Sequence, residues 1–435
     1  MPSNRHPDAD LRTPRQPATP PTPAAAVRHA VSAVYIVFIG SGLAFASWAS
    51  RIPQVRDRLE VTPAQLGLLL WCIAVGSVIA MPLSGLVVSR FGEARTIAVM
   101  ATTLAIGLAT VAVGVTRDVT PVAIGLFLMG FGNGTWDVAM NVQGAAVEQL
   151  LRRAIMSRFH AGFSVGTVAG ALIGSLMVAL HVSVTIHLLA VAGAVVAVVP
   201  TSTRWFLPHA AAVEGHPEDQ PSRSPLAAWT EPRTLLIGVL VLCMAFTEGT
   251  GNDWLGVAVI DGYHAAAVLG SLALAVFVAS MTAGRWFGPG LIDRYGRVPV
   301  LRGSAFIAFV GLLLVVFGSV LPLAMAGVVL WGLGAALGFP VGMSAAADDP
   351  RRSAGRVSVV ASIGYVAFLA GPPAIGLLGD HVGVLRALTI AAGLLAIAVL
   401  VAGACKPLAV TAPATGPGRR PGNESPADLN LSQPR

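Results

Sequence analysis

Long apolar segments recur along the chain, and short loops that hold most of its charged residues separate them. Each segment has about 20 residues, the length that a helix needs to cross the hydrocarbon core of a bilayer. The pattern predicts an all-α integral membrane protein with twelve transmembrane helices. The predicted spans are 29–50, 64–88, 96–115, 120–144, 158–180, 183–203, 233–257, 265–289, 298–318, 321–344, 355–378 and 384–404.

A polar stretch after the sixth span divides the chain into two halves. The stretches before the first span and after the last are rich in Pro and small residues, a composition typical of disorder. The predicted parts are a disordered cytoplasmic tail at 1–28, an N-terminal six-helix bundle at 29–203, a cytoplasmic linker at 204–232, a C-terminal six-helix bundle at 233–404 and a disordered cytoplasmic tail at 405–435.

The two halves repeat each other. The Gly-Phe-Gly at 130–132 corresponds to the Gly-Leu-Gly at 332–334, and the Arg-Phe-Gly at 90–92 corresponds to the Arg-Tyr-Gly at 294–296. The offsets are 202 and 204, and further matches between the first and seventh and between the fifth and eleventh spans have offsets of 201 and 198. Matches in order at nearly constant offset indicate a duplicated unit, and hence two pseudo-symmetric six-helix bundles.

The composition agrees with this class, because 55% of the residues are hydrophobic and 11% are charged, against about 25% charged in soluble proteins. Cys72, Cys243 and Cys405 lie in or beside apolar spans without the spacing of metal ligands, so we expect no disulfide framework, metal or other cofactor. The first apolar run begins about 30 residues into the chain and has the length of a span, so we read no signal peptide.

The distribution of basic residues predicts the orientation in the membrane. With the N-terminus inside, the inner loops and tails hold 22 of the 28 Lys and Arg residues. The outer loops hold Arg51, Arg56, Arg58, Arg117 and Arg386. This asymmetry predicts a multi-pass protein of the plasma (inner) membrane with both termini cytoplasmic. The net charge of +7 therefore reflects membrane topology, and no nucleic-acid partner is expected. We predict that the cluster at 51–58 forms a short surface helix.

The fourth span carries a polar stripe. Asn133, Asp137 and Asn141 are spaced by four residues and therefore share one face of a helix. An ionisable residue at membrane depth is costly and is a functional-site hypothesis by default. Asp137 is thus either a ligand of a transported solute or a residue that only fixes helix packing. The neighbouring aromatic residue Trp136 is a candidate to stack on a ring-shaped solute.

The seventh span holds a second constellation. Glu248 lies just past the middle of the span, and Asn252 follows it on the same face. Gly249 and Gly251 predict a broken helix here, because glycine is a weak helix former. We place Asp253 near the outer edge of the span.

Arg285 in the eighth span lies about four residues from the predicted inner boundary. It either extends to the membrane surface or serves as a counter-ion to Asp137. His160 near the start of the fifth span could titrate near neutral pH, with an ordinary helix-end histidine as the alternative. Phe339 and Tyr365 are candidates to face a ligand, with an ordinary packing role as the alternative.

Two loops carry a family resemblance. Gly85-Leu-Val-Val-Ser-Arg-Phe-Gly92, followed by Arg95, resembles the loop between the second and third helices of the major facilitator superfamily, and Asp293-Arg-Tyr-Gly-Arg297 resembles its second copy. Ser89 and Pro289 depart from the usual pattern. Within that superfamily, Trp48–Pro53, the polar stripe and Gly338–Gly342 are similar to the fucose-permease-like branch.

The resemblance implies that spans 1, 4, 7 and 10 surround a central cavity, and it carries a functional carboxylate over to Asp137. From their positions we assign substrate binding to Asp137, Asn133, Asn141, Trp136, Asn252 and Phe339, and proton coupling to Glu248 and Asp137. The loop residues Arg90, Arg95, Asp293, Arg294 and Arg297 are predicted to gate the inner end. Their alternative role is that of ordinary positive-inside residues.

The chain contains no phosphate-binding Gly-Lys-Ser/Thr loop and no other enzyme motif, so an ion gradient is the expected energy source and no enzymatic activity is expected. A carboxylate removed from water binds a proton more readily, which favours protons, with sodium as the alternative. We expect a monomeric secondary transporter for a small polar, sugar-like solute, with the bilayer as its other partner. Proton-driven efflux of small molecules or drugs is the runner-up, and a transport-inactive membrane sensor or scaffold is the alternative of a different class.

Overall fold

The computed structural model describes residues 24–151, 155–207, 225–349 and 352–408. All regular structure in these ranges is helical. The N-terminal half contains α1 (Ala24–Ala49), α2 (Ile52–Leu59), α3 (Pro63–Phe91), α4 (Glu93–Gly114), α5 (Val119–Leu151), α6 (Met156–Ala179) and α7 (Val184–Ser202), followed by the 3-10 turn η1 (Thr203–Trp205).

The C-terminal half begins with the 3-10 turn η2 (Pro225–Thr230), which lies within the predicted linker. Its helices are α9 (Pro232–Tyr263), α10 (Ala267–Tyr295), α11 (Arg297–Phe317), α12 (Leu321–Ala335), α13 (Gly338–Ala346), α14 (Ser353–Val382), α15 (Val384–Ala387) and α16 (Thr389–Val401), with η3 (Ala402–Cys405) last. Most of the linker and nearly all of the two predicted tails lie outside the described residues.

The predicted all-α membrane fold is confirmed. Within the described residues, eleven helical segments are long and apolar enough to cross a membrane. The twelfth span is α5, which has 33 residues but is less apolar because it carries the polar stripe. The helices match the predicted spans closely and in several cases extend beyond them: α10, for example, continues to Tyr295, where the apolar run suggested an end near residue 289.

The predicted break in the seventh span is wrong. Helix α9 is continuous through Gly249 and Gly251. These glycines serve packing instead: a Cβ atom on Gly251 would lie 2.5 Å from the ring of Phe277 in α10. Small residues at such positions let neighbouring helices approach closely.

A break is found instead in the tenth span, between α12 and α13, at residues 336–337. Pro340 lies in the first turn of α13. Because proline has no amide hydrogen, the carbonyl of Ala336 four residues earlier loses its intrahelical donor. The guanidinium Nε of Arg285 in α10 donates to that carbonyl at 3.4 Å, so a neighbouring helix partly satisfies the break.

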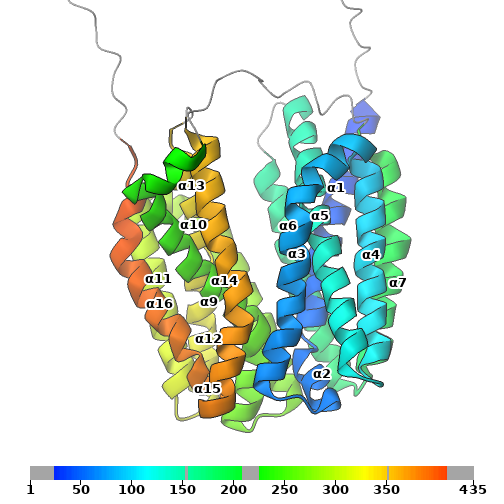
Figure 1. The fold of residues 1–435 in the computed structure, drawn as a ribbon, viewed down its shortest axis with the longest axis vertical. Coiled ribbons are helices and arrows are strands. Elements are labelled where there is room, and N and C mark those ends of the chain that lie inside the picture. Colours follow the sequence, from blue (N-terminus) through cyan, green and yellow to red (C-terminus); the bar gives the residue numbers. More distant parts are fainter. Residues whose placement is uncertain (1–23, 152–154, 208–224, 350–351, 409–435) are drawn as a thin grey trace, which may run out of the picture.

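The two halves pack as separate bundles (Figure 1). In the first, α5 lies against α3 and α4, and α1 lies against α6, whereas in the second α9 packs on α14 and α11 on α12. Across the interface, α3 contacts α14 and α6 contacts α10. The ribbons of the halves approach each other at the end that carries α2 and α15, and they diverge toward the end where α1 begins and η3 ends. We call these the α2 end and the termini end.

Candidate solute-binding site

The polar stripe of α5 lies at the middle of its helix. Asn133, Asp137 and Asn141 are all partly exposed, whereas Gly134 and Thr135 between them are buried. The Nδ2 atom of Asn141 donates to the main-chain oxygen of Asp137 at 2.8 Å and more weakly to its carboxylate at 3.4 Å. The carboxylate makes no other hydrogen bond and no ion pair within the described residues. The stripe therefore presents a carboxylate without a cation partner.

A residue of α1 extends the stripe. The hydroxyl of Ser41 donates to Oδ1 of Asn133 at 3.1 Å, which orients this side-chain amide. The Nδ2 group of Asn133 then remains available as a donor in the part of the chain that the structure describes.

An ion pair lies at the same depth in the C-terminal half. Glu248 is the central residue of α9, and its carboxylate accepts a hydrogen bond from NH2 of Arg285 at 2.7 Å. The side chains are 17% and 30% exposed, so the pair is accessible from one side. Arg285 is ten residues from the end of α10 at Tyr295, so it lies deeper than its expected position near the inner boundary. It pairs with Glu248, and Asp137, which was one of two alternatives considered for it, is not its counter-ion.

Electrostatic contacts link these groups across the interface of the halves. The charge of Arg285 acts on His160 of α6, and the charge of Asp137 acts on Tyr365 of α14. The Tyr365 ring lies 6.4 Å from that of Phe368. The stripe of α5 and the ion pair of α9 and α10 thus each lie near a residue of the opposite half.

The remaining predicted ligands occupy different environments. Trp136 is 0% exposed and packs against Gly40 of α1, so it belongs to the core of the N-terminal half. Asn252 is partly exposed, and its Oδ1 has no partner within the described residues. Phe339 is partly exposed in the first turn of α13, near Gly364 of α14.

The residues that we predicted to gate the inner end lie at the termini end. Arg90, Arg95 and Asp293 are exposed and form no ion pair with another described residue. Arg294 lies over the ring of Tyr295, with 5.2 Å between the guanidinium carbon and the ring centroid. These side chains do not join the two halves in this conformation.

Arg297 is the exception among the predicted gating residues, because it forms an ion-pair network within the C-terminal half. Its NH1 lies 2.5 Å from the carboxylate of Asp348, which also accepts from Arg233 at 2.9 Å. The network ties the start of α11 to the chain after α13 and to the start of α9.

Contacts between the halves are concentrated at the α2 end. The guanidinium of Arg56 in α2 forms a bidentate pair with the carboxylate of Asp261 in α9. The carboxylate of Asp380 in α14 accepts from the hydroxyl of Thr62 at 3.2 Å and from the amide of Ala64 at 3.1 Å. Sequence reasoning missed this contact set. The sequence did contain a hint of these contacts, because Arg56 belongs to the basic cluster that lies on the outer side against the general charge distribution.

The short helix predicted for the basic cluster at 51–58 is confirmed as α2 (Ile52–Leu59), but Arg51 before it is not at the surface. Arg51 is 2% exposed, and it donates to Nδ1 of His187 and to the main-chain oxygen of Val182, both at 2.9 Å. His187 accepts this bond from its buried position in α7.

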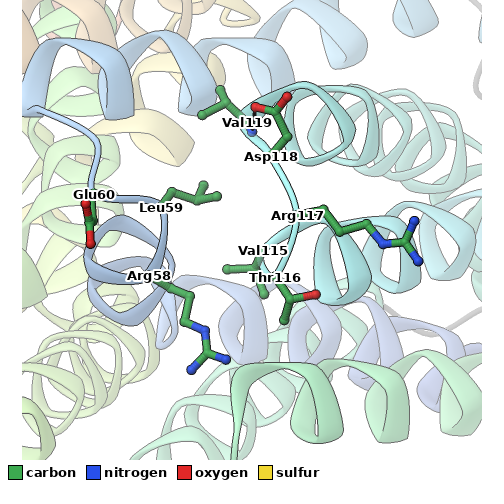
Figure 2. Close-up of a pocket in the computed structure, with 8 residues that line it drawn as sticks. All are labelled: Arg58, Leu59, Glu60, Val115, Thr116, Arg117, Asp118 and Val119. Atoms are coloured by element: carbon green, nitrogen blue, oxygen red, sulfur yellow. Dashed lines mark hydrogen bonds between the residues drawn. The ribbon is translucent and has the colours of Figure 1, made fainter.

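A pocket with a volume of about 350 Å³ lies at the α2 end of the N-terminal half (Figure 2). It is formed by α2 and the turn between α4 and α5. Leu59 and Val115 point toward its opening, while the head groups of Arg58 and Arg117 extend in different directions. It contains none of the mid-depth polar residues, so we do not assign the solute to it.

Two bundles of membrane-spanning helices that meet around polar groups at mid-depth define a two-bundle membrane transport protein. The chain belongs to the Major Facilitator Superfamily, whose family model matches residues 34–362 and again 241–431. It is 32% identical over 346 residues to an uncharacterized transporter of Sinorhizobium fredii, covering 79% of this chain and 89% of that protein. It is 30% identical over 366 residues to an uncharacterized MFS-type transporter of Yersinia pestis, covering 84% and 92%.

Solved structures share the fold. A bacterial homolog of the human lysosomal transporter Spinster, in an inward-facing and occupied conformation, has a TM-score of 0.71 at 12% identity and covers 88% of this chain and 97% of its own. The nucleoside transporter NupG has a TM-score of 0.70 at 16% identity, with 86% and 99% covered. The E. coli fucose:proton symporter FucP has a TM-score of 0.58 at 16% identity, with 86% and 98% covered.

Proposed function

We propose that the chain is a proton-coupled secondary transporter that takes up a small polar solute, with sugars and nucleosides as the favoured class, across the inner membrane. The observation that carries this proposal is the pairing of surfaces at mid-depth. One half offers the partly exposed stripe around Asp137, and the other offers the accessible pair of Glu248 and Arg285. A monomer contains both surfaces.

The chemistry of these groups suits a neutral solute with several hydroxyl groups. Asn133 and Asn141 supply amides, Asp137 supplies an acceptor, and Arg285 supplies donors that its pairing with Glu248 does not exhaust. Tyr365 and Phe339, which are partly exposed, add aromatic faces for a ring. Two structural neighbours are a nucleoside transporter, NupG, and a fucose:proton symporter, FucP, which agrees with this class.

The ion pair changes our assignment of the proton carrier. Glu248 would have to give up a charge-assisted hydrogen bond at 2.7 Å in order to take up a proton. Asp137 would give up only a long contact with the Asn141 amide, because it has no cation partner within the described residues. We therefore propose that Asp137 carries the coupling proton and that the Glu248–Arg285 pair contacts the solute from the opposite half.

The arrangement of contacts supports alternating access. Hydrogen bonds join the halves at the α2 end, whereas the predicted gating residues at the termini end remain apart. The distribution of Lys and Arg places the termini end in the cytoplasm. In this proposal the conformation described above faces inward. Closure of the termini end would bring the exposed side chains of the two halves closer together, namely Arg90, Arg95, Asp293 and Arg294.

The proposal is tested in two steps with the full-length protein. Thermal stability is first measured against a panel of hexoses, pentoses, nucleosides and lipophilic cationic drugs, because a ligand of the folded state raises apparent stability. A stabilising sugar or nucleoside is then followed into proteoliposomes under an imposed inward pH gradient. Accumulation above the outside concentration is expected. Stabilisation by cationic drugs alone would favour efflux, and neither binding nor flux would favour a sensor or scaffold.

A further inference from the structure

A small cavity lies between α9 and α14, away from the proposed solute site. It has room for a single water-sized sphere, about 10 Å³, and a space of this size is near the minimum that holds one water or one small ion. Its lining residues are Phe246, Gly249, Thr250, Asp253, Trp254, Ala367, Phe368, Gly371 and Pro372. Glu248 and Arg285 are not among them.

Within the described residues, the polar side chains of α9 that border this cavity have no hydrogen-bond partner. Thr250 is 3% exposed, and its Oγ1 makes no hydrogen bond. The carboxylate of Asp253, one turn further along, forms neither a hydrogen bond nor an ion pair with another described residue. By contrast, the hydroxyl of Thr247 donates to the carbonyl of Cys243 at 2.8 Å, as a threonine in a helix normally does. An unpartnered polar group in such a place is costly unless something else binds it.

The facing helix supplies a further oxygen. Pro372 and Pro373 lie inside α14, and because proline has no amide hydrogen, the carbonyls four residues before each of them lose their intrahelical donors. Phe368 and Pro372 both line the cavity, whereas the second pair, Leu369 and Pro373, does not. In a helix the carbonyl of Phe368 points along the axis toward Pro372, so its unpaired oxygen lies on the lined face.

We propose that this cavity is a sodium site, formed by the carboxylate of Asp253, the hydroxyl of Thr250 and the carbonyl of Phe368. A carboxylate, a hydroxyl and a freed carbonyl are hard oxygen ligands, and backbone carbonyls released from a helix coordinate Na⁺ in other transporters. The single carboxylate is neutralised by one positive charge, which favours a monovalent ion over a divalent one. The indole N–H of Trp254, which also lacks an acceptor, suits a water ligand of the ion.

This inference goes beyond the proposed function, because it adds a second cation at a site that contains neither Asp137 nor the solute contacts. The site joins α9 to α14, and α14 also carries the contacts to α3 across the interface of the halves. An ion bound there would favour one arrangement of α14 relative to α9. Sodium would therefore affect the conformational equilibrium of the transporter whether or not it is itself carried.

The test measures the binding of Na⁺ to the purified full-length protein without any solute. Apparent melting temperature and binding of radioactive ²²Na⁺ are recorded as Na⁺ replaces choline or K⁺ at constant ionic strength. Saturable stabilisation by Na⁺, absent with K⁺, is expected. Thr250→Val, which keeps the shape of the side chain but removes the oxygen ligand, is expected to weaken Na⁺ binding at least about tenfold, and Thr247→Val is expected to leave it unchanged.

Two proline variants test the carbonyl ligand without changing Asp253 or Thr250. Pro372→Ala restores the amide that pairs with the carbonyl of Phe368, so Na⁺ binding is expected to weaken although the helix gains a hydrogen bond. Pro373→Ala restores an amide away from the cavity and is expected to leave Na⁺ binding intact. Equal effects of Na⁺ and K⁺ on the wild type, or unchanged Na⁺ binding in Thr250→Val and Pro372→Ala, would overturn the sodium site. Because no transport is measured, such a failure leaves the role of Asp137 untouched.

Discussion

The carboxylate of Glu248 lies 2.7 Å from the guanidinium of Arg285, at the middle of the C-terminal bundle. The two residues come from different helices, α9 and α10, and Arg285 also contacts the carbonyl at the break between α12 and α13. One ion pair thus connects three spans of this half. Removing one partner of such a pair leaves an uncompensated charge, which costs more than the pair itself contributes.

The first prediction concerns this pair. Glu248→Gln leaves the charge of Arg285 without its counter-ion, so the apparent melting temperature is expected to fall. Loss of one partner of a fully buried pair costs roughly 3–5 kcal/mol, and the partial exposure of both side chains reduces that figure. The double variant Glu248→Gln/Arg285→Gln is expected to recover most of the loss, because no charge remains unpaired. A double variant that is as unstable as the sum of the single ones would contradict the pairing.

The second prediction concerns proton coupling. Asp137→Asn mimics a permanently protonated acid, so it is expected to retain solute binding and counterflow exchange but to lose accumulation driven by a pH gradient. The measurement compares counterflow and gradient-driven uptake in the same proteoliposomes. Asn141→Ala serves as a control: it removes the amide next to the carboxylate and is expected to weaken binding while coupling persists. Normal accumulation by Asp137→Asn would contradict this role and would make Glu248 or a sodium ion the better candidate for coupling.

The positions of the helices could be predicted from the sequence because the bilayer sets the length of each apolar run. The predicted span 96–115, for example, is observed as Glu93–Gly114. The polar stripe on α5 could also be predicted from the sequence, because it depends only on the spacing of residues within one helix. Partners on different helices could not be predicted, and Arg285 pairs with Glu248, which was neither of the two alternatives that the sequence offered for it. The break was misplaced because Gly249 and Gly251 resemble helix breakers in the sequence, although α9 continues through them. The observed break lies just before Pro340, which removes a hydrogen-bond donor, but proline alone does not decide it, because Pro372 and Pro373 lie inside the continuous helix α14.

The third prediction concerns pH and an ion pair outside the membrane spans. Hydrogen bonding to Arg356, followed by the bond from Thr234, lowers the pKa of Glu231 against the opposing effect of burial. Arg356 lies 2.5 Å from the Glu231 carboxylate. A group with a lowered pKa in the folded state stabilises the fold above its unfolded pKa, about 4.3 for Glu. This contribution is lost as the pH falls below that value toward the folded pKa.

The measurement for Glu231 compares the apparent melting temperatures of the wild type and Glu231→Gln between pH 7 and pH 3.5. The difference is expected to be largest above about pH 5 and to shrink as the pH falls below about 4.3. Glu60→Gln, an exposed residue at the end of α2, is the control and is expected to show no such trend. A difference that is constant across this pH range would show that the ion pair does not contribute.

The last prediction concerns the contact between the halves at the α2 end. In the bidentate pair Arg56 is 13% exposed and Asp261 is 38% exposed, so only the arginine side of this pair is better shielded than in an ordinary surface salt bridge. We expect it to contribute at the upper end of the range for exposed pairs, about 1 kcal/mol. Its removal by Arg56→Ala would shift the population of the two conformations roughly fivefold toward opening of the α2 end. Arg58→Ala is the matched control, because Arg58 lies on the same short helix and has no such partner in the described residues.

Distances between spin labels would report this shift. Thr116 and Ser319 are exposed at the α2 end on opposite halves, and cysteines placed there in a cysteine-free background can carry the labels. Arg56→Ala is expected to add a population at longer distance, and Arg58→Ala is expected to reproduce the parent distribution. High salt should have the same effect as Arg56→Ala, only smaller, because a partly shielded pair is only partly screened. An unchanged distribution in Arg56→Ala would mean that Asp380 with Thr62, together with the packing of α3 on α14, holds this end closed without the ion pair.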